Sequence, residues 1–181
     1  MTMNTKNIIA GLRKNMLLYG LILFVLLLFM LFRKPFILLL LIAGGGLSTI
    51  YKLVINVSIG FELITFFSIL ITYAYGIGAG IISMALMTLI SHFTTGRICP
   101  TMFGKMMVYA VVLAAALFFS PANIASVGIG LSVAVYALFF FMYIFVFGYN
   151  PISSFTSAAG GIFFNYIFFS RLGEALLKLL I

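Results

Sequence analysis

The chain has almost no acidic side chains. Its 181 residues include two carboxylates, Glu62 and Glu174, while 65% of the sequence is hydrophobic. Charged residues make up 7% of the chain, whereas a soluble domain has about 25%. A protein of this composition could not cover itself with a water-compatible surface. We therefore expect its solvent to be lipid, and we expect a multi-pass protein of the cell membrane.

Apolar segments of about 20 residues, the length of a membrane-spanning helix, follow one another along the chain. They predict an all-α, polytopic integral membrane bundle of six to seven transmembrane helices, folded as a single domain over residues 1–181. The expected parts are a basic interfacial segment at 1–15, an additional span at 16–32, a six-helix core at 36–170 and an amphipathic tail at 171–181. The core helices are expected at 36–55, 61–75, 77–93, 103–119, 124–147 and 152–170.

The charge of the chain is strongly positive. Ten Lys and Arg residues against two Glu give a net charge of +8. These cations are scattered near the predicted span ends, which indicates a role in topology and in contacts with lipid headgroups rather than in nucleic-acid binding. With seven spans, six of the ten cations fall on the side of the amino terminus, a slight bias toward a cytoplasmic amino terminus.

Side chains that support catalysis or metal binding are scarce. Metal-dependent catalysis needs clustered Asp, Glu or His ligands, and the sequence has one His and no Asp. His92, Cys99 and Glu62 do not lie at a known ligand spacing, and no acid is near enough in sequence to orient His92 as a base for Ser91. We therefore expect no enzyme, no metal and no cofactor. An enzyme that acts on lipid ranks third, after the two functions given at the end of this section.

The polar residues of the core fall on one side of the predicted bundle. Because successive spans reverse direction, one face collects Lys52, Asn56, Glu62, His92, Thr94, Thr95, Arg97, Lys105 and Asn150. Two interpretations are open. The charges are solvated loop residues with long apolar stems, or they line a pocket for an anionic group. In the second case, we expect Arg97 and Lys105 to hold the anionic group and His92, Asn150 and Glu62 to form hydrogen bonds.

Two groups of small residues have the spacing that lets helices approach closely. They are Gly44 with Ser48, and Gly76 and Gly78 with Gly80. Such residues either pack helices inside a bundle or offer a docking face to a partner helix. The sequence leaves both interpretations open.

From about Leu38 to Phe169, the order of features resembles the substrate-binding S component of energy-coupling-factor (ECF) transporters. It has a small-residue patch at 43–48, the sequence Phe-Glu-Leu-Ile-Thr-Phe at 61–66, a Tyr-Gly-x-x-x-Gly passage at 75–80 and a polar loop at 92–100. The resemblance implies a six-helix membrane protein that docks on a coupling subunit by its small patch. It also implies a substrate near the outer face, under the loops at 54–60, 94–102 and 148–151. Two departures are the additional span at 16–32 and a glycine run where the family has Ala-x-x-x-Ala.

Two functions follow from these features. The first hypothesis is a substrate-capture subunit of a vitamin or metabolite importer. Its expected partners are a small-molecule ligand, membrane lipids, a membrane coupling subunit and ATPases. The outline is also similar to the rod-shape protein MreD, so the alternative is a non-catalytic structural or assembly subunit that binds other membrane subunits through its glycine faces.

Overall fold

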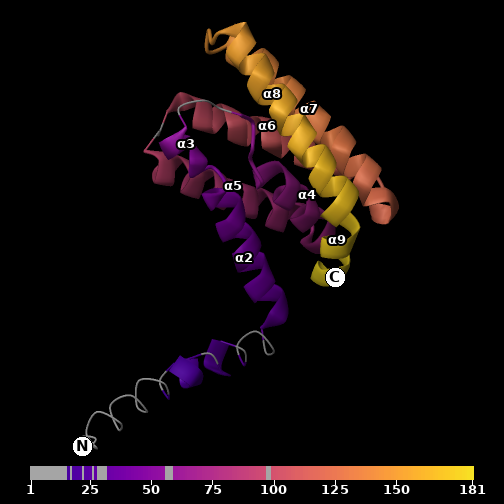
Figure 1. Ribbon diagram of the computed structural model, residues 1–181. Helices are drawn as coiled ribbons and strands as arrows, with labels where there is room; N and C mark the ends of the chain where they lie inside the picture. The colour runs from indigo at the N-terminus through magenta and orange to yellow at the C-terminus, as the bar shows by residue number, and fades with distance from the viewer. Residues whose placement is uncertain are drawn as a thin grey trace, which may run out of the picture. The chain divides into compact units, whose positions relative to one another are not determined.

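A computed structural model describes most of the chain (Figure 1). The described residues are 16, 18–21, 23–25, 27, 32–55, 59–96 and 99–181. Within these ranges every regular element is helical and no strand occurs, which confirms the all-α prediction. The predicted interfacial segment at 1–15 lies outside the described residues, as does much of the predicted span at 16–32.

The chain forms two compact units, Met1–Ile37 and Leu38–Ile181. The boundary falls within helix α2 (Arg33–Leu47), and the second unit holds all the later elements. These are α3 (Tyr51–Val54), α4 (Ile64–Tyr75), α5 (Ile77–Thr95), α6 (Pro100–Ala116), η1 (Pro121–Asn123), α7 (Ile124–Phe145), α8 (Pro151–Phe168), η2 (Phe169–Gly173) and α9 (Glu174–Leu180). The predicted organisation as a single domain over 1–181 stays a prediction.

Prolines and glycines set the ends of several helices. α6 and α8 begin at Pro100 and Pro151, where the fixed φ of proline suits the first helical position. The side chain of Asn150 caps α8, since its Oδ1 accepts a hydrogen bond of 2.8 Å from the backbone N–H of Ile152. α5 ends at Thr95 and is followed by the capping residue Gly96, whose φ of 64° is the left-handed conformation that favours glycine. These ends lie within a few residues of the boundaries expected from the sequence.

Four helical stretches among the described residues are long and apolar enough to cross a membrane. They are Arg33–Val54, Ile77–Thr95, Pro121–Phe145 and Pro151–Leu180. The described residues also include two shorter apolar helices, Ile64–Tyr75 and Pro100–Ala116. Length and composition therefore indicate a membrane protein with transmembrane helices.

Helix α4 is the centre of the second unit. It packs against α5, α6, α7, α8 and α9, and its residues Ile69, Leu70 and Ile71 are at most 1% exposed. α7 and α8 run side by side in opposite directions, joined by a short connection (Figure 1). At one end of this unit, α4, α6 and α8 begin and α5 and α7 end. We call this the polar end, because Lys52, Glu62, His92 and Lys105 lie there.

Glycines allow close approaches between the helices of this unit. A Cβ added at Gly46 of α2 would lie 2.6 Å from the Ile90 side chain, and one at Gly45 would overlap the Met87 sulfur. A Cβ at Gly80 would overlap Thr72 of α4. Internal packing therefore accounts for these three glycines.

Candidate solute-binding pocket

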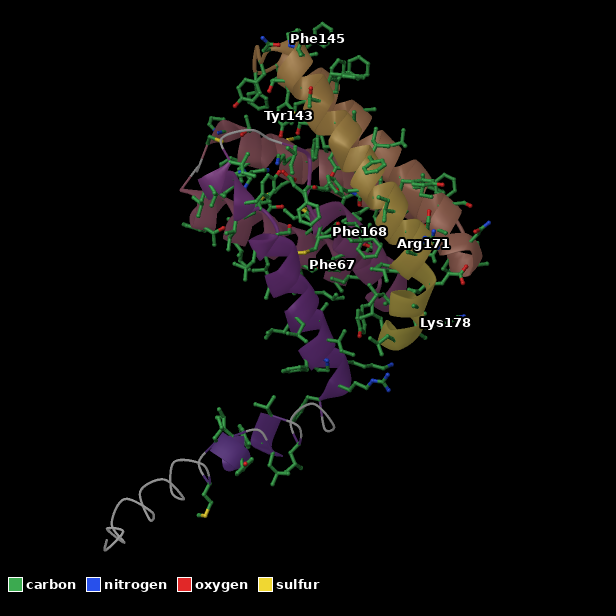
Figure 2. The ribbon with its side chains drawn as sticks, in the orientation of Figure 1. Phe67, Tyr143, Phe145, Phe168, Arg171 and Lys178 are labelled. Carbon is green, nitrogen blue, oxygen red and sulfur yellow. The ribbon has the colours of Figure 1, made fainter. Side chains whose placement is uncertain are left out.

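A polar cavity of about 430 Å³ lies at the polar end of the second unit. Its charged and titratable lining includes Lys52, Glu62, His92, Cys99, Lys105 and Tyr143. Six parts of the chain supply the lining: α3, the segment before α4, the adjoining ends of α5, α6 and α7, and the start of α8. Figure 2 places Tyr143 toward this end of the bundle, and Arg171 and Lys178 toward the other.

Three charged side chains meet in the cavity. The carboxylate of Glu62 accepts hydrogen bonds from the ammonium groups of Lys52 and Lys105, and the Lys105 nitrogen lies 3.1 Å from Oε1 and 3.3 Å from Oε2. Glu62 is 6% exposed, and the side chains of Lys52 and Lys105 are 14% and 12% exposed. Two ammonium groups against one carboxylate leave this cluster with one unit of excess positive charge.

The environment of Glu62 favours its charged form. Burial by itself disfavours an ionised carboxylate. The ammonium groups of Lys105 and Lys52, which both donate hydrogen bonds to it, offset this cost. Glu62 is therefore an anion at neutral pH, and it ties α3 and α6 to the start of α4.

Backbone contacts hold the segment that carries Glu62. Gly60 has a φ of 76°, and a Cβ there would overlap the Ser157 carbonyl oxygen and the Gly161 nitrogen of α8. A Cβ at Gly160 would in turn overlap the carbonyl oxygen of Ile59. Only glycines permit this contact, because lack of space excludes a side chain at both positions and the left-handed φ disfavours one at Gly60 as well. The segment therefore rests directly on the backbone of α8.

Four of the five residues predicted to bind a substrate line this cavity. They are Glu62, His92, Lys105 and Asn150, whereas Arg97 lies outside the described residues. His92 Nδ1 is 2.8 Å from the carbonyl oxygen of Thr88, so Nδ1 donates and Nε2 of the neutral ring is left as an acceptor. The structure brings these side chains together, and their role in binding a solute stays a prediction.

The four residues assigned to helix packing or docking lie away from the cavity lining. Ser48 Oγ donates to the Gly45 carbonyl at 2.7 Å and accepts from the Leu63 N–H at 3.1 Å, so it fixes the start of α4. A Cβ added at Gly44 would lie 3.6 Å from the Phe67 ring, an ordinary contact, whereas one added at Gly76 would meet open space. Gly80 packs internally against α4, as described above.

Sequence reasoning missed much of the hydroxyl lining. α8 presents Ser153, Ser154 and Ser157 to the cavity, next to the predicted Asn150 that caps its start. Their spacing of i, i+3, i+4 and i+7 is the signature of one helical face, and it was available in the sequence. Lys52 is not among the five residues predicted to bind a substrate, although its ammonium group bonds Glu62 directly.

The fold and the cavity define a class: an all-helical protein with apolar helices of membrane-spanning length and a cation-rich polar cavity at one end. Among the residues that the structure describes, no group of three His, Cys, Asp or Glu side chains could hold a metal ion. Comparison with protein-family models, with curated proteins and with solved structures finds no match. The cavity is therefore the starting point for assigning a function.

Proposed function

We propose that the chain is a substrate-capture subunit of a vitamin or metabolite importer of the ECF type, and that it crosses the cell membrane six or seven times. The cavity carries this proposal. Removing charged groups from water costs several kcal/mol for each ion unless partners compensate. Three charged side chains, none more than 14% exposed, nevertheless gather in one cavity of an apolar bundle. A bundle that only fills space has no need of such a cavity.

Helix lengths support a cavity that reaches into the membrane. α7 has 22 residues and rises about 33 Å, which matches a hydrocarbon core of about 30 Å. α4 has 12 residues and rises about 18 Å. The segment before α4 contacts α8 at Ser157 and Gly161, six and ten residues after α8 begins at Pro151. The start of α4 therefore lies below the level where α8 begins, and the cavity lies above it. Crossings by α4 and by the 17-residue α6 would complete a six-helix core.

The lining favours a small solute with an anionic group. The cluster of Lys52, Lys105 and Glu62 has one excess positive charge, and hydroxyl groups on α8 supply further hydrogen-bond partners. The volume of about 430 Å³ falls within the range of about 300–1,000 Å³ that is typical of small-molecule sites. The rings of Tyr143 and Tyr149 lie 5.4 Å apart at the rim and add apolar contact area.

Native mass spectrometry of the protein, purified gently from its own membrane, tests the proposal. We expect a retained small anion of defined mass on the wild-type chain and its loss from Lys105→Gln. Lys178→Gln is the matched control, because it removes an exposed cation from α9 at the far end of the unit. A wild-type chain that carries no solute, or a solute equally retained by Lys105→Gln, would contradict the proposal.

The alternative, a structural or assembly subunit, has one observation in its favour. Gly76 and Gly78, at the start of α5, have open space where a side chain would lie, so a partner helix could approach there. This hypothesis expects Gly78→Leu to lose co-purifying membrane subunits. The control is Gly130→Leu, at another open glycine on α7. A chain that keeps its solute and binds no partner through this face would argue against it.

A further inference from the structure

We propose that the ligand of the polar cavity is a small anion that also carries an uncharged hydrogen-bond donor, a hydroxyl or N–H group. His92 accepts a hydrogen bond from this donor, and Ser154 forms a further hydrogen bond with the ligand. The inference rests on the proposed function and adds the chemical class of the ligand. Two buried polar groups without a partner carry it, together with the positive charge of the cavity.

The ring of His92 offers a hydrogen-bond acceptor to the cavity. His92 is 8% exposed and belongs to the cavity lining. Its Nδ1 donates to the carbonyl oxygen of Thr88, so Nε2 of the neutral ring can only accept. Among the described residues, no group donates to this Nε2, and protein atoms do not enclose it completely. A ligand group that faces Nε2 must therefore be a donor.

The hydroxyl group of Ser154 is the second group without a partner. Ser154 is 5% exposed and lines the cavity. Buried Ser and Thr side chains in helices can donate to a carbonyl group one turn earlier, as Ser68, Thr72 and Ser132 do. Every other buried Ser or Thr that the structure describes forms a hydrogen bond within the protein, whereas the Ser154 hydroxyl forms none. Ser154 therefore keeps its hydrogen-bonding capacity for an occupant of the cavity.

The charge of the cavity disfavours a cationic donor on the ligand. Lys52 and Lys105 exceed the charge of Glu62 by one unit. An ammonium group on the ligand would be repelled by this excess, whereas a carboxylate or a phosphate ester is attracted. The donor that meets His92 is therefore an uncharged hydroxyl or N–H group.

The lining thus has two kinds of hydrogen-bonding group. Each lysine ammonium group has three N–H donors, and those that Glu62 does not use complement the oxygens of an anionic group. A simple carboxylate has acceptors alone, so it satisfies the lysines and leaves His92 Nε2 unpaired. Sites built to bond a hydroxyl or N–H group reject analogues that lack it, because buried polar groups are then left without a partner.

Matched pairs of carboxylates test this selectivity. Lactate and propionate differ by a hydroxyl group, as do para-hydroxybenzoate and para-toluate in the place of a methyl group. The α-carboxylates of pyrrole and furan carry a ring N–H donor and a ring oxygen. Cys99 is the single cysteine of the chain and lines the cavity, so a bound probe should slow its reaction with N-ethylmaleimide. Mass spectrometry of the protein in phosphatidylcholine nanodiscs measures the rate.

We expect the donor-bearing member of at least one pair to protect Cys99 at a concentration about tenfold lower than its counterpart requires. His92→Phe keeps a planar ring without the acceptor and should reduce this preference to less than about twofold. Ser154→Ala should weaken protection by the donor-bearing member about threefold. Ser132→Ala is the matched control, because Ser132 is also buried but donates to the Gly128 carbonyl and lies outside the cavity lining. It should leave the preference unchanged.

Equal protection by both members of every pair, or stronger protection by the member without a donor, would overturn the inference. The proposed function would then stand, because the cavity would still bind anions by charge. A preference that His92→Phe retains would also overturn the inference, since the donor would be recognised elsewhere. If His92→Phe does not fold, an unchanged affinity in Ser154→Ala overturns it instead. If no probe protects Cys99, both proposals fail.

Discussion

Replacing Glu62 with Gln removes the negative charge that Lys52 and Lys105 share. Gln has nearly the same shape as Glu, so the change tests charge rather than packing. We expect it to lower the free energy of unfolding by about 3–5 kcal/mol, the usual cost of breaking a buried ion pair by removing one partner.

This magnitude can be worked from the geometry. The Lys105 nitrogen lies 3.1 Å from Glu62 Oε1. At that separation, an effective dielectric constant of about 20 gives an attraction of about 5 kcal/mol for the pair. Much of this attraction is offset by the cost of burying the charges in the folded state. Once Glu62 is neutral, the two ammonium groups stay in the cavity without a counter-charge, and their mutual repulsion adds to the loss.

Thermal unfolding in nanodiscs, followed by circular dichroism, measures the effect. For a chain of this size, we expect the midpoint to fall by roughly 10 °C. Glu174→Gln is the matched control, because Glu174 is the chain's second carboxylate and is exposed on α9. The double variant Glu62→Gln with Lys105→Met should recover part of the loss, since it removes one surplus cation.

An equal midpoint for Glu62→Gln and Glu174→Gln would refute this reasoning. It would mean that water reaches the Lys52 and Lys105 ammonium groups well enough to replace the carboxylate. A double variant less stable than Glu62→Gln alone would also contradict it, because repulsion between the cations would then not be the cause.

Three further predictions concern the same end of the molecule. Gly60→Ala should prevent stable folding, because it forces a left-handed φ and overlaps the backbone of α8, whereas Gly130→Ala, in open space within α7, should be neutral or raise the midpoint slightly. Because Glu62 forms its ion pairs with Lys52 and Lys105 only as a carboxylate, its contribution to stability is present above the pKa of an unfolded Glu, about 4.3, and is lost as the pH falls further. The wild-type midpoint should therefore fall below about pH 4 more steeply than that of Glu62→Gln. Finally, Cys99 should react faster with an anionic than with a cationic thiosulfonate, a preference that mass spectrometry can follow and that Lys105→Gln should reduce.

The helices were largely predictable from the sequence, because apolar runs and breakers act locally. Pro100, Pro151 and Gly96 define helix ends in the structure within a few residues of the expected positions. The gathering of polar residues at one end also followed from the alternating direction of successive helices. Both inferences need only the order of segments along the chain.

Contacts between helices could not be predicted in the same way. Glu62 accepts hydrogen bonds from Lys52 and Lys105. The order of segments placed these three residues on one face, but their pairing depends on how α3 and α6 meet. The predicted extra span and interfacial segment lie largely outside the described residues.

The contact of the Glu62 segment with α8 has an electrical consequence. Under the proposed function, a solute held beside Glu62 would lie part of the way through the low-dielectric layer, so its charge would sense a fraction of the transmembrane voltage. If that fraction is about one third, a potential of about 100 mV changes the binding free energy of a monoanion by about 0.8 kcal/mol, a three- to fourfold change in affinity. Affinity for an anion should therefore depend on voltage, and the sign of the dependence reports which compartment the cavity faces.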